Sequence, residues 1–216
     1  MTKPITIGDE AHVSQMQFPL WKRAFDLFIS SLGLLILSPF FLLIAAIIKL
    51  DSAGPVFFRQ ERIGYRFDKF RIYKFRTMVV DASKKGKLLT AFNDDRITRV
   101  GMILRKAKID EMPQLLNVWL GEMTLVGPRP EVEKYVRLFA QDYREILKIR
   151  PGITDLASLK YRNESEILRL AADAEEEYIA RVLPDKIALA KEYVRRSSLF
   201  FDISLILKTV AKTVAG

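Results

Sequence analysis

The chain has 216 residues, and its 35 Lys and Arg residues against 26 Asp and Glu residues give a net charge of +9. It contains no cysteine, which excludes disulfides and thiolate metal sites. The single histidine, His12, lies in a polar N-terminal stretch, so nucleophilic or acid–base chemistry would fall to carboxylates, lysines, tyrosines or hydroxyl groups. The excess of positive charge indicates an anionic partner.

Residues 1–18 are predicted to form a flexible tail, and residues 19–50 a membrane segment. An uncharged apolar run occupies 27–48, between Lys22-Arg23 and Lys49. As one helix it would be about 33 Å long, enough to cross a hydrocarbon core of about 30 Å. It is too long for the core of a signal peptide, so we expect a retained anchor. A buried helix of a soluble core is the alternative, but such helices seldom stay uncharged for this length.

Ser38-Pro39 lies at the middle of this run. Proline lacks an N–H and clashes with the carbonyl group four residues earlier, so a kink or break is expected there. The Ser38 hydroxyl could satisfy a backbone group freed at the break. Cations flank both ends of the run, and Lys and Arg mark the cytoplasmic side, which favours a re-entrant helix-break-helix. A kinked helix that spans the bilayer remains open on these grounds.

Residues 51–216 are enough for one compact cytoplasmic domain with its own core. Basic and aromatic residues alternate between Phe57 and Arg76. This mixture suits single-stranded nucleic acid. Directly after a membrane segment it is better explained by lipid head groups, with aromatic side chains at the interface.

The pattern predicts an α+β, mainly helical domain with a small strand pair and amphipathic helices. Thr98 can cap one helix, Gly121 can end another, and two prolines should stiffen the loop at 126–130. The expected elements are strands at 56–62 and 69–76, a polar loop at 82–93, rigid loops at 126–130 and 150–154, and helices at 98–107, 110–120, 131–148, 163–182, 184–196 and 199–214.

The last of these helices is amphipathic. Five apolar residues share one of its faces: Phe200, Ile203, Leu207, Val210 and Val214. We expect this face to pack on the core, with contact to the membrane surface as the functional alternative.

The sharpest local feature is the pair Asp110-Glu111, followed by Pro113. Proline is tolerated only in the first turn of a helix, so the helix should begin near Asp110 and place this residue in the N-cap region. Free N–H groups there favour a carboxylate or a phosphate. An ordinary capping Asp with a first-turn Glu is the simpler interpretation. Arg105 upstream, and Arg129 between two prolines, favour a phosphate site instead.

Adjacent carboxylates among arginines allow one coherent chemistry. One carboxylate attacks phosphorus, the other holds a divalent cation, and the arginines neutralise phosphoryl oxygens. Mg²⁺ commonly binds through one or two carboxylates plus substrate phosphates, so no larger set of protein ligands is required. The chain has no phosphate-binding loop of the ATPase type and no dinucleotide-binding glycine motif.

Nine short motifs occur in order along most of the chain. They are Lys22-Arg23 with Asp26, Ser38-Pro39, Gly54-Pro55-Val56-Phe57-Phe58-Arg59-Gln60, Lys74-Phe75-Arg76-Thr77-Met78, Asp95-Arg96-Ile97-Thr98-Arg99-Val100-Gly101, Arg105-Lys106, Asp110-Glu111-Met112-Pro113-Gln114, Val126-Gly127-Pro128-Arg129-Pro130-Glu131 and Arg150-Pro151-Gly152-Ile153-Thr154. Each motif alone is weak, but the ordered set is specific. With it the chain resembles the bacterial sugar transferases, the monotopic phosphoglycosyltransferases, in the short form that consists of the catalytic core.

The resemblance implies a Mg²⁺-dependent enzyme that moves a sugar 1-phosphate from a UDP-sugar to polyprenol (undecaprenyl) phosphate. Asp110 would attack the sugar-bearing phosphorus, release UMP and hold a covalent phosphosugar, and Glu111 would bind Mg²⁺. The candidates for phosphate contacts are Lys74, Arg76, Arg105 and Arg129. The enzyme would start lipid-linked glycan synthesis on the cytoplasmic face of a bacterial inner membrane, anchored by a re-entrant helix broken at Ser38-Pro39.

The expected partners are the UDP-sugar, the polyprenol phosphate and membrane lipid, with no nucleic acid and with a homodimer left open. Three departures from the family pattern limit the transfer: Lys108 replaces a frequent Ser, Asp95 a frequent Pro, and Asp155-Leu156 a Gly with an aromatic or apolar residue. The alternative is a membrane-anchored basic module that binds anionic lipid or nucleic acid without catalysis.

Overall fold

The computed structural model describes residues 19–80 and 94–214, so the predicted tail at 1–18 and loop at 82–93 lie outside the described residues. The fold is mainly helical, with a small strand pair and one long apolar helix at its start, as predicted. The strands are β1 (Phe57–Ile63), β2 (Lys69–Phe75), β3 (Thr124–Val126) and β4 (Gly152–Thr154). The helices are α1 (Leu20–Asp51), α2 (Arg99–Lys106), α3 (Leu115–Leu120), α4 (Glu133–Leu138), α5 (Ala140–Ile146), α6 (Leu156–Lys160), α7 (Glu164–Arg169), α8 (Ala174–Glu177), α9 (Leu183–Arg196) and α10 (Leu199–Val214). Short turns of other helix types are η1 (Tyr65–Phe67), η3 (Ile109–Gln114) and η4 (Tyr178–Val182).

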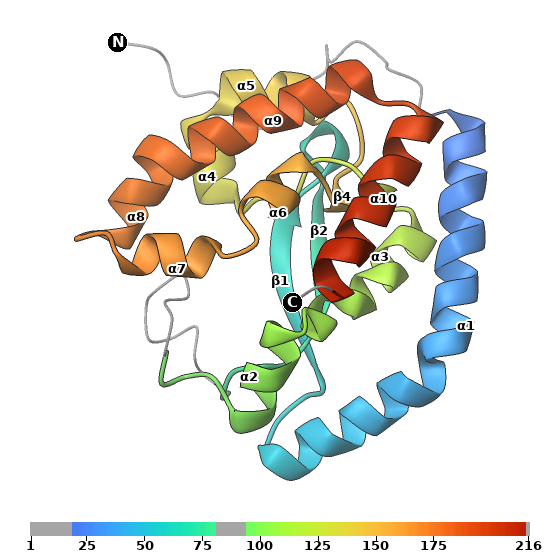
Figure 1. Cartoon of the computed structure of the whole chain (residues 1–216), viewed down its shortest axis with the longest axis vertical. Helices are drawn as coiled ribbons and strands as arrows, with labels where there is room; N and C mark the ends of the chain where they lie inside the picture. Colours follow the sequence, from blue (N-terminus) through green and yellow to red (C-terminus); the bar gives the residue numbers. More distant parts are fainter. Residues whose placement is uncertain (1–18, 81–93, 215–216) are drawn as a thin grey trace.

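Helix α1 is continuous through Pro39, so the predicted break is not a gap in the helix. The helix does bend partway along its length, and its second half passes beneath the rest of the molecule (Figure 1). The hydroxyl group of Ser38 donates to the carbonyl oxygen of Leu35 (2.9 Å), as expected for a serine that satisfies a carbonyl near a proline.

The buried side of α1 is unusual for a helix of this composition. In its first half the buried positions are Lys22, Asp26 and Ser30, spaced four residues apart on one face. The apolar side chains point outward: only 11% of the most apolar window of α1 is buried. Among the residues that the structure describes, α1 is the helix long and apolar enough to cross a membrane. In this half the polar stripe faces the domain, whereas in the second half the buried positions are the apolar Ile44 and Ile48.

Strands β1 and β2 form the antiparallel hairpin that the sequence predicts, with Phe58 opposite Lys74. The predicted caps also hold. The Thr98 side chain accepts a hydrogen bond from the backbone N–H of Gly101 at the start of α2. Gly121 ends α3 in the left-handed conformation (φ 86°) that favours glycine.

A second, parallel pairing joins β3 to β4, where the sequence predicts only a loop at 150–154. Strand β4 has only three residues, which is too short for an alternating apolar pattern to identify it as a strand. A Cβ atom on Gly152 would lie 2.1 Å from the backbone nitrogen of Gly127, so the two glycines let the backbones meet directly after β3.

Two long predicted helices are interrupted. The segment 131–148 forms α4 and α5, separated at Phe139, whose backbone is not helical. The segment 163–182 forms α7, then α8 and η4, with a break before Asp173, which caps α8. Pro184 lies near the start of α9, as predicted, but η4 runs into α9 without a gap.

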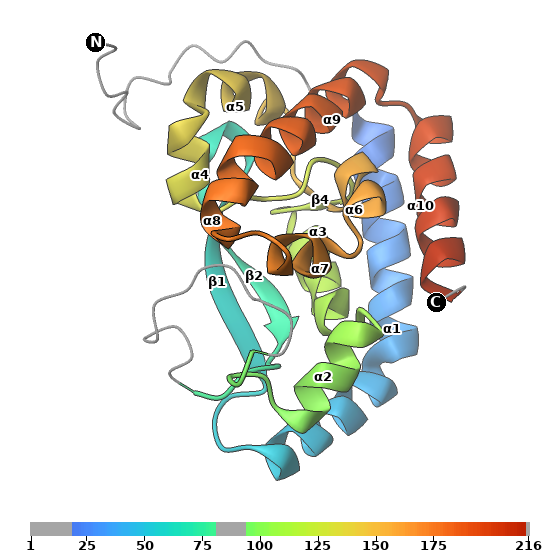
Figure 2. The same cartoon turned by 60° about the vertical axis from the view of Figure 1, so that its left-hand side comes forward.

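Helix α10 has the predicted bounds, but its apolar stripe does not pack on the core. Phe200 is 86% exposed and Leu207 64% exposed, whereas Asp202 and Leu205 are buried. The expectation of core packing for this stripe is therefore wrong. The helix contacts the core through its other side and lies beside the first half of α1 (Figures 1 and 2).

The core consists of three clusters around the hairpin. One lies between the turn of the hairpin, α4, α5 and α9, and includes Tyr143 and Leu183. A second lies between β2, α3, β3 and α10, and includes Val118 and Leu205. The third joins the second half of α1 to α2 and the end of β2 through Phe75. These clusters place η3, the end of β3 and β2 next to one another.

Candidate functional site

The predicted acid pair lies in η3, a short turn that leads directly into α3. The residue before this turn is Lys108, whose backbone is left-handed (φ 58°), an uncommon conformation for a residue other than glycine. The helix therefore begins one residue earlier than expected, with Lys108 at the N-cap, and Asp110 lies inside the first turn. Pro113 is accepted within this turn, as the sequence predicts.

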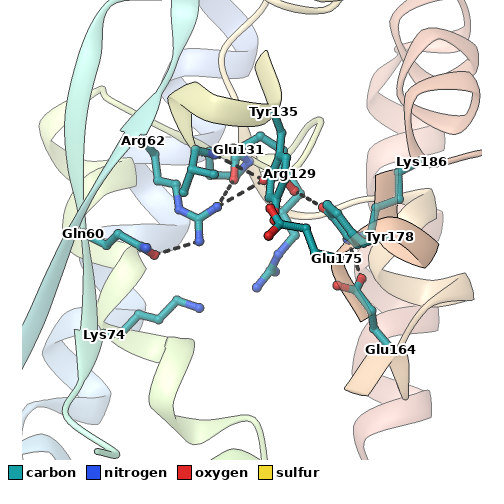
Figure 3. A network of polar contacts seen from close by, with 12 residues as sticks. Gln60, Arg62, Lys74, Arg129, Glu131, Tyr135, Glu164, Glu175, Tyr178 and Lys186 are labelled. Atoms are coloured by element: carbon teal, nitrogen blue, oxygen red, sulfur yellow. Dashed lines mark hydrogen bonds and ion pairs between the residues drawn. The ribbon is translucent and has the colours of Figure 1, made fainter. Parts of the chain in front are cut away.

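Glu111 is held between two cations that come from different parts of the chain. The ammonium group of Lys74 donates to Glu111 Oε1 (2.6 Å) from the neighbouring strand β2. Arg129 Nη1 donates to Glu111 Oε2 (3.1 Å), and Arg129 Nη2 forms a further ion pair with Oε1. Lys74 and Arg129 point toward the same space from opposite sides (Figure 3).

These contacts set the charges of the three groups. Burial alone would raise the pKa of the Glu111 carboxyl, but the charges of Arg129 and Lys74 outweigh burial and hold this pKa well below its usual range. Burial lowers the pKa of the Lys74 ammonium, against the opposing effect of Glu111. The Glu111 carboxylate raises the pKa of Arg129. Glu111 is therefore a fixed anion with both oxygens in use.

Asp110 is different, although it is the next residue. It is 8% exposed, and no side chain or backbone N–H within residues 19–80 and 94–214 donates a hydrogen bond to its carboxylate. Burial, followed by the negative charge of Glu111, raises the pKa of the Asp110 carboxyl, with Lys74 and Arg105 opposing the increase. The pair thus combines one carboxylate bound by cations with one whose lone pairs carry no hydrogen bond.

Arg105 and Arg76 lie in different surroundings. Arg105 is half-buried on α2, its Nε donates to Thr77 Oγ1 (2.8 Å), and its charge acts on Asp110. Arg76, directly after β2, is buried beside the C-terminal end of α1. There its Nη2 atom donates to the carbonyl oxygen of Ser52 (2.6 Å). Its Nε and Nη1 atoms have no hydrogen-bond partner among the described residues. The structure thus joins Lys74, Arg105 and Arg129 to the acid pair and places Arg76 against the last turn of α1.

Arg129 owes its position to the β3–β4 pairing. The backbone N–H of Gly152 donates to the carbonyl oxygen of Pro128 (2.9 Å), and that of Gly127 donates to Thr154 (3.0 Å). The N–H of Arg129 itself donates to Asp155 Oδ2 (3.1 Å). Asp155 is 2% exposed, and its other oxygen accepts from the N–H of Ser158 at the start of α6.

Sequence reasoning did not assign a role to Asp155, which it treated as a departure from the family pattern. The signal available was an Asp placed three residues before a Ser at the start of a helical stretch, which indicates an N-cap. Its second contact, with Arg129, could not be read from local sequence because 26 residues separate the two.

A second polar network borders the Arg129 loop (Figure 3). Arg62 Nη1 donates to the carbonyl oxygen of Pro130 (3.2 Å), and Arg62 Nη2 donates to Gln60 Oε1 (2.8 Å). On the other side, the hydroxyl group of Tyr178 donates to Glu131 Oε1 (2.6 Å). These contacts hold the second proline of the loop and the residue after it, so both ends of the Arg129 segment are fixed.

The acid pair is the candidate site for Mg²⁺. Within the described residues there is no group of three or more His, Cys, Asp or Glu side chains that could hold a metal ion. Asp110 and Glu111 supply two carboxylates, and Mg²⁺ often takes no more than this when phosphate oxygens and water complete its shell. Because both Glu111 oxygens contact cations, the residues fit Mg²⁺ only together with a phosphate-bearing ligand.

Comparison with known proteins gives consistent matches over most of the chain. The model of the family described as bacterial sugar transferase matches residues 17–216. The exopolysaccharide production protein ExoY of Rhizobium meliloti is 35% identical over 227 residues, covering 97% of this chain and 92% of that protein. The UDP-glucose:undecaprenyl-phosphate glucose-1-phosphate transferase of Caulobacter vibrioides is 36% identical over 213 residues, covering 97% of this chain and 75% of that protein.

A third relative differs in length and in its named sugar. The UDP-N-acetylgalactosamine-undecaprenyl-phosphate N-acetylgalactosaminephosphotransferase of Aeromonas hydrophila is 37% identical over 200 residues, covering 90% of this chain. The chain spans 44% of the length of that protein. With a family model that matches nearly all residues and relatives of similar length, the chain belongs to the bacterial sugar transferase family.

Proposed function

We propose that this protein transfers a sugar 1-phosphate from a UDP-sugar to polyprenol (undecaprenyl) phosphate and releases UMP, the first step of lipid-linked glycan synthesis. The single observation that carries the proposal is the asymmetry of the acid pair. Asp110 has a carboxylate that accepts no hydrogen bond from the part of the chain that the structure describes, and its neighbour Glu111 is bound by Lys74 and Arg129. The names of two relatives, which describe transfer of a sugar phosphate to undecaprenyl phosphate, support it.

In the proposed reaction, a carboxylate oxygen of Asp110 attacks the phosphorus that carries the sugar. The bond from this phosphorus to the bridging oxygen breaks, and UMP leaves with that oxygen. A phosphate oxygen of the polyprenol phosphate then attacks the same phosphorus and displaces Asp110, which returns as a free carboxylate. The product is polyprenyl diphosphate sugar, and no redox step or further reactant is needed.

The cations around the pair have distinct tasks in this scheme. Arg129 presents a planar, forked donor that can bind two phosphate oxygens at once, whereas Lys74 is a point charge on the neighbouring strand. Arg105 lies on the Asp110 side, where it would neutralise charge on the transferred group. Glu111, with Asp110 beside it, would hold Mg²⁺ together with phosphate oxygens of the donor, and the bound ion would neutralise charge on the diphosphate.

The position of the pair suits one soluble and one lipid substrate. Helix α3, which continues from the acid pair, packs against α1, and α2 does so as well. We place α1 in the cytoplasmic leaflet of the bacterial inner membrane as a re-entrant anchor bent at Pro39, with the domain on the membrane surface. The cations at both ends of the apolar run support this placement.

To test this, purified protein is incubated with Mg²⁺ and a panel of UDP-sugars, including the glucose and N-acetylgalactosamine donors, and UMP release is measured. UMP should form in an amount comparable to enzyme before any polyprenol phosphate is added, and the protein should carry the labelled phosphosugar. Asp110→Asn should lose both signals. Asp68→Asn, a change at an exposed position away from the pair, serves as the matched control.

If Asp110→Asn releases UMP at the normal rate, Asp110 is not the nucleophile. If no UDP-sugar is consumed and binding to anionic vesicles instead falls steeply with salt, the chain is a basic membrane module without catalysis.

A further inference from the structure

Three charged side chains in the first two turns of α1 contact the catalytic segments. The ammonium group of Lys22 donates to the carbonyl oxygen of Val126 (3.1 Å) and pairs with Asp202 of α10. Asp26 accepts hydrogen bonds from Thr124 Oγ1 (2.7 Å) and from the N–H of Leu125 (3.1 Å). All the residues of strand β3 are therefore bound by α1.

The third side chain, Arg23, contacts the other catalytic segment. Its Nη1 and Nη2 atoms donate to the carbonyl oxygens of Val118 (2.6 Å) and Trp119 (2.8 Å) at the end of α3. Gly121, which follows, leaves room for this guanidinium group, since a Cβ atom there would lie 3.3 Å from Arg23 Nη2. Helix α3 begins directly after the turn that carries Asp110 and Glu111.

The contacts around Lys22 are closed off from solvent. Lys22 is 4% exposed, Asp202 1% and Tyr193 0%. The hydroxyl group of Tyr193 lies 2.7 Å from Asp202 Oδ1 and 2.8 Å from the carbonyl oxygen of Val126, so it belongs to the same network. Because breaking such a pair leaves an uncompensated buried charge, α1 cannot rotate or slide without a large cost.

Stability alone does not explain why this contact is charged. Apolar residues of similar size often stabilise a protein as well as a buried ion pair does. However, α1 is apolar on its remaining faces, so an apolar contact would allow several rotations of the helix against the domain. A stripe of Lys22, Asp26 and Ser30 fits only one rotation, since any other would take Lys22 and Asp26 away from their partners in β3 and α10 and leave buried charges unpaired.

We infer that Lys22, Arg23 and Asp26 are positioning residues, which set the Arg129 loop and the acid-pair helix against one another through the anchor helix. Val126 is three residues before Arg129. The carbonyl groups that Arg23 binds lie at the C-terminal end of α3, the short helix that follows the turn containing Glu111. Loss of the contacts with α1 would therefore let the two partners of the Arg129–Glu111 contact move independently. The inference rests on the proposed function only for its kinetic readout.

The first test uses Thr124, whose hydroxyl group donates to Asp26. Thr124→Val removes this hydrogen bond at nearly constant shape, and Thr124→Ser keeps it. With the full-length protein in nanodiscs, we expect kcat per folded enzyme to fall about 10- to 100-fold in Thr124→Val, the scale of a small misplacement of reacting groups. KM for the UDP-sugar should change little, and Thr124→Ser should stay near the wild type. Normal kcat in folded Thr124→Val would overturn the inference.

The second test separates positioning from stability. Lys22→Met leaves Asp202 unpaired and is expected to destabilise the fold, whereas Lys22→Met combined with Asp202→Leu removes both charges and should recover the melting temperature. If the pair positions the site, the double variant recovers stability but not kcat. Recovery of both would show that the pair only stabilises. Glu192→Gln, in an exposed ion pair of α9, is the control.

A third measurement needs no substrate. The chain has no native cysteine, so spin labels at Leu20 of α1 and Leu138 of α4, both exposed, report the distance between the anchor and the segment after Arg129. We expect a narrow distance distribution that broadens in the double variant. An unchanged distribution would overturn the inference. If the wild type releases no UMP, the proposed function fails, but this distance measurement still decides whether α1 positions the loop.

Discussion

The guanidinium group of Arg129 bonds to both carboxylate oxygens of Glu111, although the two residues are 18 positions apart in the sequence. This contact joins the loop between β3 and α4 to the turn before α3. It leaves Asp110, the neighbour of Glu111, as the carboxylate that accepts no hydrogen bond within the described residues. The two adjacent acids therefore lie in different environments. Different environments allow one pair of carboxylates to take two roles, one ion-paired and one free to act as a nucleophile.

Glu111→Gln should impair both activity and stability. The substitution removes the charge that Lys74 and Arg129 share and leaves two cations beside each other. Loss of one partner from a buried ion pair costs about 3–5 kcal/mol, so the lower end, ~3 kcal/mol, is expected for this partly exposed group. Activity should fall about 100-fold, as for loss of one preorganised electrostatic contact. Urea unfolding and UMP release measure the two effects, and an unchanged unfolding midpoint would show that the ion pairs are weak.

Asp110→Asn should abolish labelling yet stabilise the protein at neutral pH. The folded pKa of Asp110 lies above its ordinary value of 3.8 because the site disfavours the charged form. As pH rises from 3.8 through the folded pKa, the unfolded chain ionises first, so this residue's contribution to stability is lost. Asparagine does not ionise, so the variant does not lose this stability as the pH rises. The stability difference between variant and wild type, measured by urea unfolding, should grow from pH 4 to pH 7, and a difference that is constant with pH would contradict this.

Lys108→Gln should move the acid limb of the pH–rate profile to higher pH. The Lys108 ammonium group lowers the pKa of Asp110, and a nucleophilic carboxylate must be ionised, so loss of this cation raises the pH at which activity appears. Because Lys108 is exposed, the shift should shrink as salt is added. Lys106→Gln, a nearby exposed lysine, is the control, and an equal shift in both variants would point to net charge instead.

Single cysteines should reveal whether α1 returns to the side from which it enters. We expect a cysteine at Thr2 and one at Asp51 to resist an impermeant maleimide in intact cells and to react after permeabilisation. The charges at both ends of the apolar run and the bend near its middle support this expectation. Labelling at Thr2 but not at Asp51 in intact cells would instead show a spanning helix.

Local features were predicted well from sequence. The strands at 57–63 and 69–75, the Thr98 cap and the glycine end of α3 depend on alternation, capping and turn chemistry within a few residues. Features that depend on distant partners were missed. Strand β4 is too short to show a pattern, and Phe139 interrupts a helix whose apolar periodicity continues across it.

The sequence by itself determined a long apolar helix, a helical domain of a known family, and a pair of acids among basic residues. Hydrophobic length, composition and ordered motifs are properties of the chain, and they need no folded neighbour. Only the tertiary structure decided which acid is bound by cations, that Asp155 holds the Arg129 backbone, and that the polar face of the first half of α1 is buried. Each of these depends on contacts between distant segments, because burial and pairing are set by what the folded chain places around a charge.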